Sequence, residues 1–485
     1  EGDETARRRA WGAIAATADA RQASSIGDLS EGMRKRLTLV ACILGSTIVF
    51  VDSTVVNVAL PAIRRDLGGG LALQEWVVDA YLLTLGSLIL VGGSLGDLFG
   101  ERRVFQIGVI SFGVTSLLAA VAWDGTSLTL ARALQGVAGA LLTPAALATI
   151  TSTFSGEERG AAIGQWTAWT GISFLVGPLV GGWFVSVASW RSIFLINVPF
   201  VVVTIALVRI AIQPMSRTGP RAKIDFVGGA LCMLGLAGPV FALIEEPKRG
   251  FGDPAILVTL IGGLALLGLF LVWEKRNPAP MLPLGLFRRR NFTFANVETL
   301  TVYAALSVQS FVLVLFLQQL AGYSPFRSGL ATVPVTVVMF VLSGRVGRLS
   351  MRFGPRLFMS SGPFVCAAAM VWLRELTPGF DYWTDLLPPL LIFSAGLSLI
   401  VAPLTATVLA DAGPGDAGIA SGVNNAIARV AGLLGIAVVG AAIAGAADHL
   451  DLSGYRLAME ITAGLTVAGG VVGVAGIRNV ARTAE

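Results

Sequence analysis

The sequence predicts an all-α protein that crosses a membrane many times. Hydrophobic residues make up 54% of the 485-residue chain and charged residues only 13%, whereas a soluble domain carries about 25% charged residues. The mean hydropathy is +0.76. The apolar residues form long runs along the whole chain rather than one anchor, as in a polytopic membrane protein. This composition excludes a secreted enzyme, a disordered scaffold and an ordinary cytosolic domain.

Each predicted helix is a run of mostly apolar residues, and about 20 such residues suffice to cross a bilayer. The residues before the first run, 1–37, are polar and predict a cytoplasmic N-terminal tail. We count about fourteen runs, separated by short loops. In chain order they lie near residues 38–60, 75–96, 103–123, 127–152, 160–184, 190–212, 223–244, 254–274, 291–319, 325–344, 355–374, 383–410, 418–446 and 455–478.

The distribution of Lys and Arg predicts that both termini are cytoplasmic. If the N-terminus is inside, most basic residues fall in inside turns, such as Arg288, Arg289 and Arg290, and fewer lie on the other side. Cytoplasmic loops carry such an excess, so the net charge of +5 reflects topology and not nucleic-acid binding. The high content of Ala, Gly and Arg is typical of GC-rich bacteria. We therefore expect a multi-pass protein of a bacterial cytoplasmic (plasma) membrane.

Two basic, loop-like linkers divide the predicted helices into groups. One lies near residues 214–223 and the other at 275–290, and the two helices between them carry few polar groups. We therefore expect an N-terminal six-helix bundle at 38–213, two inserted transmembrane helices at 214–278, and a C-terminal six-helix bundle at 279–485.

The turns after the second and tenth predicted helices support two related halves. Both have glycine-rich helix ends and basic residues on the predicted cytoplasmic face. Repeated halves are typical of transporters, because rocking one half against the other gives alternating access to a site between them. The two turns read Gly93-Ser-Leu-Gly-Asp97-Leu-Phe-Gly100-Glu-Arg102-Arg103 and Gly344-Arg-Val-Gly-Arg-Leu-Ser-Met-Arg352-Phe-Gly354-Pro-Arg356.

The first turn resembles the cytoplasmic signature between helices 2 and 3 of the major facilitator superfamily, although Leu98 and Glu101 stand where that family commonly has basic residues. Three further segments resemble motifs of its fourteen-helix drug/proton antiporters and occur in the expected order. Because the matches run from about residue 38 to 440, the chain is identified as a member of that branch by resemblance. The segments are Asp52-Ser-Thr-Val-Val-Asn57-Val-Ala-Leu-Pro61, Arg132-Ala-Leu-Gln135-Gly136 and Gly171…Gly177-Pro178-Leu-Val-Gly181-Gly182.

This resemblance implies a major facilitator fold of two six-helix bundles and two inserted linker helices. It also implies a proton-coupled multidrug efflux antiporter that exports lipophilic or cationic compounds by alternating access and confers antibiotic resistance. In that family the first turn acts as a conformational latch, the fifth-helix motif as the antiporter hinge, and the fourth-helix arginine in proton coupling. The corresponding residues are Gly93, Asp97, Gly100, Arg102 and Arg103 for the latch, Gly171, Gly177, Pro178, Gly181 and Gly182 for the hinge, and Arg132 for coupling.

Three acids inside apolar runs, Asp52, Asp79 and Glu298, are the candidates for proton or cation handling. An ionised carboxylate in lipid is costly unless it is paired or faces a cavity, and burial disfavours its charged form. A proton and a cationic substrate can then compete for one carboxylate, which is the simplest form of antiport. The alternatives are a structural pair of Asp52 with the backbone or Arg132, a solvated helix end for Asp79, and the cytoplasmic mouth for Glu298.

Several aromatic and polar residues are candidates to line a substrate cavity, because aromatic faces bind cations and stack on flat molecules. Most tryptophans of membrane proteins are instead interfacial anchors, and Trp123, Trp190 and Trp383 at predicted helix ends fit that role. Gln309 shares a face of the ninth helix with Glu298. The candidates are Trp76, Trp166, Trp169, Tyr303, Gln309, Phe311 and Asn424.

The sequence predicts neither a metal site nor a cofactor. Its single histidine, His449, and three scattered cysteines give no metal-ligand spacing. It contains no glycine-rich nucleotide loop and no nucleophile with a histidine partner. We therefore expect a secondary transporter rather than an enzyme, working as a monomer in contact with membrane lipids. The alternative is a lipid or cell-envelope precursor transporter on the same scaffold, which the inserted pair near 223–274 and the long apolar helices would suit.

Overall fold

The computed structural model describes residues 30–212, 224–412, 417–443 and 450–479. Within these ranges it contains fourteen helices long and apolar enough to cross a membrane and no strand, so the predicted all-α polytopic class is confirmed. In chain order the elements are α2 (Glu31–Leu67), α3 (Gly70–Phe99), α4 (Glu101–Ala120), α5 (Gly125–Thr153), α6 (Gly156–Val187), α7 (Ser192–Leu195), α8 (Asn197–Ala211), α9 (Phe226–Arg249), α10 (Pro254–Arg276), η1 (Leu284–Arg288), α11 (Arg290–Leu315), η2 (Phe316–Leu320), α12 (Pro325–Phe353), α13 (Pro355–Leu373), η3 (Tyr382–Leu386), α14 (Leu387–Ala412), α15 (Ala417–Ile443) and α16 (Leu452–Gly476).

Helix α2 begins well before the apolar run that predicts it. Ser30 caps the helix, since its Oγ accepts a hydrogen bond from Met33 N at 3.3 Å. The first turns are polar, and Lys35 donates a hydrogen bond to Glu158 of α6 at 2.8 Å. Hydropathy marks only the apolar part of such a helix. Of the predicted N-terminal tail, residues 1–29 lie outside the described part of the chain, as does His449.

Helix α3 begins at Gly70, whereas the hydropathy pattern places its start near residue 75. The additional residues include Gln74, and Glu75 follows at the predicted start; their side chains are 0% and 1% exposed. Polar side chains lower the hydropathy even where neighbouring helices bury them, so the sequence conceals this turn. In consequence Asp79 lies more than two turns inside α3, and not at a solvated helix end.

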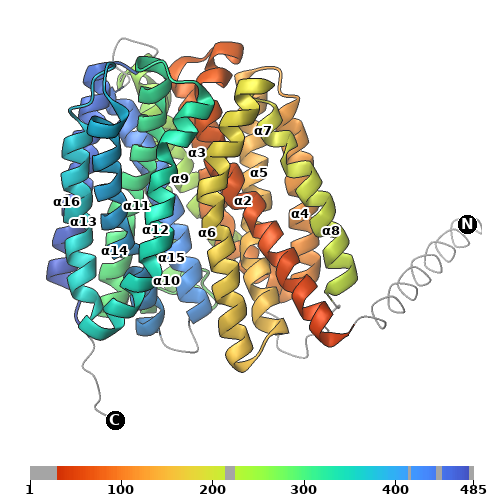
Figure 1. Cartoon of the computed structure of the whole chain (residues 1–485). Helices are drawn as coiled ribbons and strands as arrows, with labels where there is room; N and C mark the ends of the chain where they lie inside the picture. Colours follow the sequence, from red (N-terminus) through yellow and green to blue (C-terminus); the bar gives the residue numbers. More distant parts are fainter. Residues whose placement is uncertain (1–29, 213–223, 413–416, 444–449, 480–485) are drawn as a thin grey trace, which may run out of the picture.

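Figure 1 shows α2–α8 on one side of the helix bundle and α11–α16 on the other. The helix α9 packs on α10 and also on α3 and α15, one helix from each half. Helix α2 begins and α16 ends at the same end of the bundle, which we call the inner end; the opposite end is the outer end. The inserted helix α9 therefore contacts both halves.

A buried carboxylate ties α9 to α10 near the inner end. Asp225, which is 6% exposed, accepts a hydrogen bond from Gly228 N at 2.7 Å. It also accepts hydrogen bonds from Trp273 Nε1 at 2.9 Å and Asn277 Nδ2 at 2.6 Å. Burial raises the pKa of Asp225, but these hydrogen bonds outweigh burial and hold the pKa below its usual value. Asp225 therefore caps α9 as a charged group.

The two halves meet at their outer ends through α6 and α12. A Cβ atom added to Gly182 would lie 2.6 Å from the carbonyl oxygen of Pro325, and one added to Gly329 would lie 2.3 Å from that of Pro178. The two backbones are thus in direct contact, an approach that small residues make possible. A second contact joins α3 to α15. The structure therefore has its outer side closed.

Within the first half, α3 and α5 also pack through glycines. A Cβ atom added to Gly136 would lie 2.1 Å from Thr84 Oγ1 and 2.3 Å from the carbonyl oxygen of Tyr81. A Cβ atom added to Gly92 would lie 2.1 Å from the carbonyl oxygen of Ala140. Side chains at these two positions would force the helices apart.

We expect Gly92→Ala to destabilise the folded protein by about 1–3 kcal/mol, the usual effect of overpacking, since the added methyl meets a backbone carbonyl. The melting temperature of the purified protein in detergent measures the change. Gly96→Ala, one turn along the same helix, is the matched control, because no described atom lies within 4 Å of its added Cβ and alanine favours a helix by about 1 kcal/mol. Equal melting temperatures for the two variants would contradict the close α3–α5 contact.

Candidate functional site

Polar side chains from four helices form a buried cluster inside the first half, here called the Asp52 cluster (Asp52, Ser116, Arg132, Gln135 and Asn197). Asp52 of α2 pairs with Arg132 of α5 through Oδ2 and Nη1, and both are 0% exposed. Asp52 Oδ1 accepts hydrogen bonds from Gln135 Nε2 and Asn197 Nδ2, each at 3.0 Å. Ser116 Oγ accepts from the same two amides at 2.9 and 3.2 Å. The cluster joins α2, α4, α5 and α8 around one charge pair.

Further contacts fix the guanidinium of Arg132. Its Nε donates a hydrogen bond to the carbonyl oxygen of Val77 at 3.0 Å, and its Nη1 donates to Gln135 Oε1 at 2.8 Å. Its carbon Cζ lies 4.3 Å from the ring centroid of Tyr81. A fully buried charge is tolerated only when it is paired and hydrogen-bonded. Loss of either partner would therefore leave the other as an uncompensated buried charge.

The other two predicted acids, Asp79 and Glu298, are buried without a partner. Each side chain is 0% exposed. Neither carboxyl group has a hydrogen-bond partner for either oxygen among the residues that the structure describes. Asp79 belongs to α3 in the first half and Glu298 to α11 in the second, so the structure places one such acid in each half. An ionised carboxylate without a partner is costly at such a depth in a membrane.

Helices α11 and α15 are joined by amide hydrogen bonds in the second half. Asn424 Nδ2 donates to Asn296 Oδ1 at 3.0 Å and to Thr299 Oγ1 at 2.8 Å. One helical turn further along α15, the Arg429 guanidinium reaches the first half, where its Cζ lies 5.3 Å from the ring centroid of Phe50. Arg429 is half-buried, so it places a positive charge between the two halves.

The candidates for a substrate cavity fall into groups with different surroundings. Trp76 Nε1 donates a hydrogen bond to Glu245 Oε1 of α9 at 3.0 Å, which ties α3 to the inserted pair. Trp166 Nε1 donates to Ser46 Oγ of α2 at 2.9 Å. Both indole groups are thus held by neighbouring helices. Of the other candidates, Gln309 and Phe311 are 4% and 2% exposed, Tyr303 and Asn424 are half-buried, and Trp169 is 55% exposed.

The predicted latch is the turn between α3 and α4. Gly100 ends one helix and precedes the other with φ at 91°, a left-handed conformation that favours glycine. Gly354 has the same position between α12 and α13 with φ at 87°. The two halves therefore use the same backbone turn at the inner end. Of the other latch residues, Gly93 and Arg102 are half-buried, and Asp97 and Arg103 are exposed.

The predicted hinge glycines of α6 contact two different helices. A Cβ atom added to Gly177 would lie 2.0 Å from Thr54 Oγ1, and one added to Gly181 would lie 2.2 Å from Val55 Cγ2, both on α2. Around Gly171, no atom of the described residues lies within 4 Å of an added Cβ. The motif therefore packs α6 on its own half and, through Gly182 and Pro178, on α12 of the other half.

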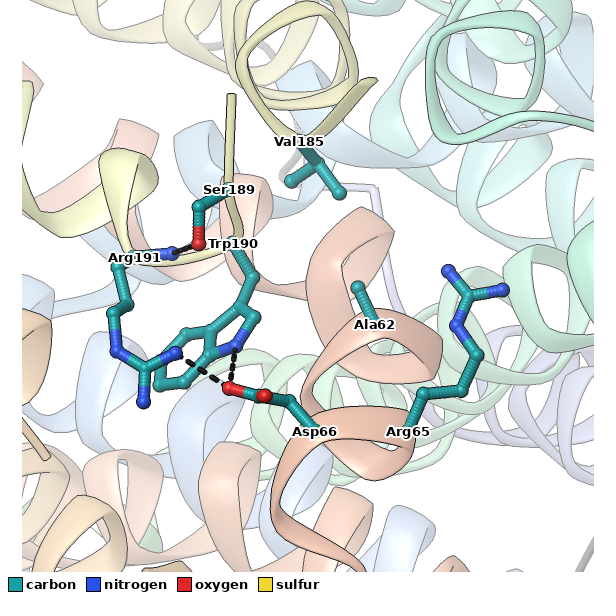
Figure 2. A pocket seen from close by; sticks show the side chains of 7 residues that line it. All are labelled: Ala62, Arg65, Asp66, Val185, Ser189, Trp190 and Arg191. Atoms are coloured by element: carbon teal, nitrogen blue, oxygen red, sulfur yellow. Dashed lines mark hydrogen bonds and ion pairs between the residues drawn. The ribbon is translucent and has the colours of Figure 1, made fainter. Parts of the chain in front are cut away.

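A hollow of about 330 Å³ lies at the outer end of the first half, and Figure 2 shows the side chains that line it. Trp190 is 4% exposed and donates from Nε1 to Asp66 Oδ2 at 2.9 Å, so it is a packed residue and not the interfacial anchor that its position predicts. Arg191 Nη1 donates a hydrogen bond to the same oxygen of Asp66 at 2.5 Å. Asp66 lies about 20 Å along α2 from Asp52, so the hollow is remote from the Asp52 cluster. Its lining residues are Ala62, Arg65, Asp66, Val185, Ser189, Trp190 and Arg191.

Comparison with known proteins places these features in context. The model of the Major Facilitator Superfamily matches residues 42–436. The cephamycin export protein CmcT of Amycolatopsis lactamdurans is 36% identical over 86% of this chain and 87% of its own. The puromycin resistance protein pur8 of Streptomyces alboniger is also 36% identical, over 85% and 83%. The methylenomycin A resistance protein of Bacillus subtilis is 32% identical, over 86% and 88%.

Solved structures show the same fold at low sequence identity. A crystal structure of the peptide transporter POT in complex with sulfate superposes with a TM-score of 0.68 at 13% identity, covering 92% of this chain and 98% of that one. The crystal structure of the human organic anion transporter MFSD10 (TETRAN) gives 0.62 at 15% identity, covering 90% and 99%.

Proposed function

The chain belongs to the Major Facilitator Superfamily, and we propose that it is a proton-coupled exporter of lipophilic or cationic small molecules that works by alternating access. It is a transporter rather than an enzyme, and its relatives named for export and resistance handle antibiotics. Their similarity extends over most of both chains, which supports export as the direction of transport here.

The observation that carries proton coupling is the burial of Asp79 without a partner in the first half. A carboxyl group in this setting is stable only when neutral, so it holds a proton in the outer-closed state. Glu298 repeats this arrangement in the second half. We propose the fully buried Asp52–Arg132 ion pair as a second element of this coupling. When the two halves open alternately to the outer and the inner side, the protein can take up a proton on one side and the substrate on the other.

The predicted domain boundaries define the moving parts. We propose that the bundles 38–213 and 279–485 rock against each other, and that the inserted pair, 214–278, stays in contact with both. The contacts of α9 with α3 and α15 support this arrangement. The boundary at 213/214 falls outside the described residues.

The membrane setting is part of the same proposal. We place the protein in a bacterial cytoplasmic membrane with the inner end, and hence both termini, in the cytoplasm. The basic residues of the inner turns support this orientation. One chain carries both halves, so we propose that the protein works as a monomer surrounded by membrane lipids.

We expect Asp79→Asn to uncouple export from the proton gradient. Asparagine keeps the shape of the side chain but cannot exchange a proton, so export of ethidium from liposomes with an imposed pH gradient falls about tenfold or more. Exchange of ethidium without a gradient persists. The control is Glu375→Gln, an exposed acid paired with Arg374, which retains coupled export. Gradient-driven export at the wild-type rate in Asp79→Asn would refute this role, and wild-type export that ignores the gradient would refute proton coupling itself.

A further inference from the structure

Glu75 is a second buried acid of α3, and the cycle proposed above assigns it no part. Its side chain is 1% exposed, and its Oε1 has no hydrogen-bond partner within the part of the chain that the structure describes. It precedes Asp79 by one helical turn, so the two carboxyl groups face the same side of α3. Asp79 lies deeper in the membrane, and Glu75 lies closer to the outer end.

Glu75 also lies at the contact between the two halves. A Cβ atom added to Gly440 of α15 would lie 2.1 Å from Glu75 Oε1 and 2.4 Å from its Cδ. The carboxyl group therefore rests directly on the bare backbone of the other half. Its burial depends on this contact, because it loses its cover on that side when the outer ends of α3 and α15 separate.

The inserted pair covers the same region from another direction. Trp76, next to Glu75, donates a hydrogen bond to Glu245 of α9. The ring centroid of Trp76 lies 6.1 Å from that of Phe241, also on α9. Among the charged residues of α9, Glu245 and Lys248 act electrostatically on Glu75. Charged groups also lie on the middle and outer parts of the other helices packed against α3. They are Asp52, Arg64, Arg65 and Asp66 of α2, Glu246 and Arg249 of α9, Arg132 of α5 and Arg429 of α15, while Glu101, Arg102 and Arg103 of α4 lie at the inner end.

Burying an ionised carboxylate without a partner is far more costly than burying the neutral acid. We propose that Glu75 is an outer proton-binding site that must be filled before the outer side closes. With the halves apart, the Glu75 carboxylate takes a proton from hydronium in the outer water; one O–H bond forms on Glu75, and the hydronium becomes water. Only the neutral acid is then buried as α15 closes on α3. The proposal rests on the proton coupling proposed above and names where the proton is received.

This site gives the inserted helices a specific role. Helix α9 covers α3 beside Glu75, so the acid is shielded on that side in both states. The remaining approach is the contact between α3 and α15, which opens only toward the outer side. Proton entry is thereby tied to the conformation of the two halves, as an antiporter requires if protons are not to leak through it.

The test measures the separation of the outer ends as a function of pH. The three cysteines, Cys42, Cys232 and Cys366, are replaced with alanine, and spin labels are placed at Arg65 and Thr377, both exposed at the outer end of opposite halves. In reconstituted protein without substrate, we expect the label distance to lengthen as the pH is raised. Glu75→Gln, which mimics the protonated acid, holds the short distance at every pH.

Matched variants separate Glu75 from its neighbours. Glu460→Gln, an exposed acid on the outer part of α16, keeps the wild-type pH response. Glu75→Asp restores the response that Glu75→Gln lacks, which excludes a folding defect at this position. We also expect Glu75→Gln to lose about tenfold or more of gradient-driven ethidium export, while exchange without a gradient persists.

Two results would overturn the proposal. One is a wild-type distance that does not change with pH; the other is a Glu75→Gln distance that lengthens with pH as in the wild type. Both differ from the result that would defeat proton coupling itself, which is wild-type export that ignores the pH gradient. A coupled wild type with an unaltered Glu75→Gln variant leaves the coupling in place and removes Glu75 from it.

Discussion

Arg132→Ala is expected to abolish export and to destabilise the folded protein by about 3–5 kcal/mol, the usual effect of breaking a buried ion pair. The substitution leaves the buried Asp52 without its counter-charge, with only the amides of Gln135 and Asn197 to donate hydrogen bonds to it. It also removes the hydrogen bond to Val77 and the packing on Tyr81. The melting temperature in detergent and ethidium export from liposomes measure the two losses.

Two further variants show what the pair contributes. Arg348→Ala removes an exposed arginine of α12 and should melt close to the wild type. The double variant Asp52→Asn with Arg132→Gln replaces the charge pair by two neutral amides, so we expect it to recover much of the lost stability but none of the coupled export. If Arg132→Ala and Arg348→Ala melted alike, the pair would not hold the first half together.

Gly182→Val is expected to keep the outer side open. The added side chain meets the backbone of α12 at Pro325 and Phe326, where neither helix can yield without separating. Overpacking of about 1–3 kcal/mol shifts the ratio of closed to open protein by about 5- to 150-fold. We expect export to fall accordingly and the distance between spin labels at Arg65 and Thr377 to lengthen.

The matched control for Gly182→Val lies on the same helix. Gly164→Val adds the same side chain at an exposed position where no described atom outside the helix's own backbone lies within 4 Å of the Cβ, so we expect wild-type export and label distances. The Gly182 contact lies between the two halves and not inside either of them. We therefore expect the melting temperature of Gly182→Val to stay near that of the wild type. A label distance in Gly182→Val equal to that of Gly164→Val would refute the outer contact as a gate.

The sequence predicts the helices well, since hydropathy reports directly what the bilayer requires of each span. It fails at helix starts for the same reason. The first turns of α2 and α3 carry polar residues, such as Lys35 and Gln74, that bond to neighbouring helices or are buried by them. The hydropathy of one helix carries no information about the neighbouring helices that bury these residues or hydrogen-bond to them.

The candidate site is predicted only in part. Asp52 and Arg132 stand out because charges are rare in apolar runs, and their pairing was one of the alternatives open from sequence. Ser116 and Asn197 complete the cluster, yet a lone serine or asparagine in an apolar run gives no sign of its partner on another helix. Glu75 gives no sign of its burial in the sequence, because it falls where the predicted helix begins. The one signal that Ser116, Asn197 and Glu75 share is a polar side chain within an apolar span.

The outer contact between α6 and α12 is made by main-chain atoms, with Gly182 facing Pro325 and Gly329 facing Pro178. A contact of this kind requires only that positions 182 and 329 carry no side chain. Natural selection can therefore exchange the residues that choose the cargo while the gate continues to shut. Substrate recognition in such exporters can therefore diverge while the outer contact between the two halves stays the same.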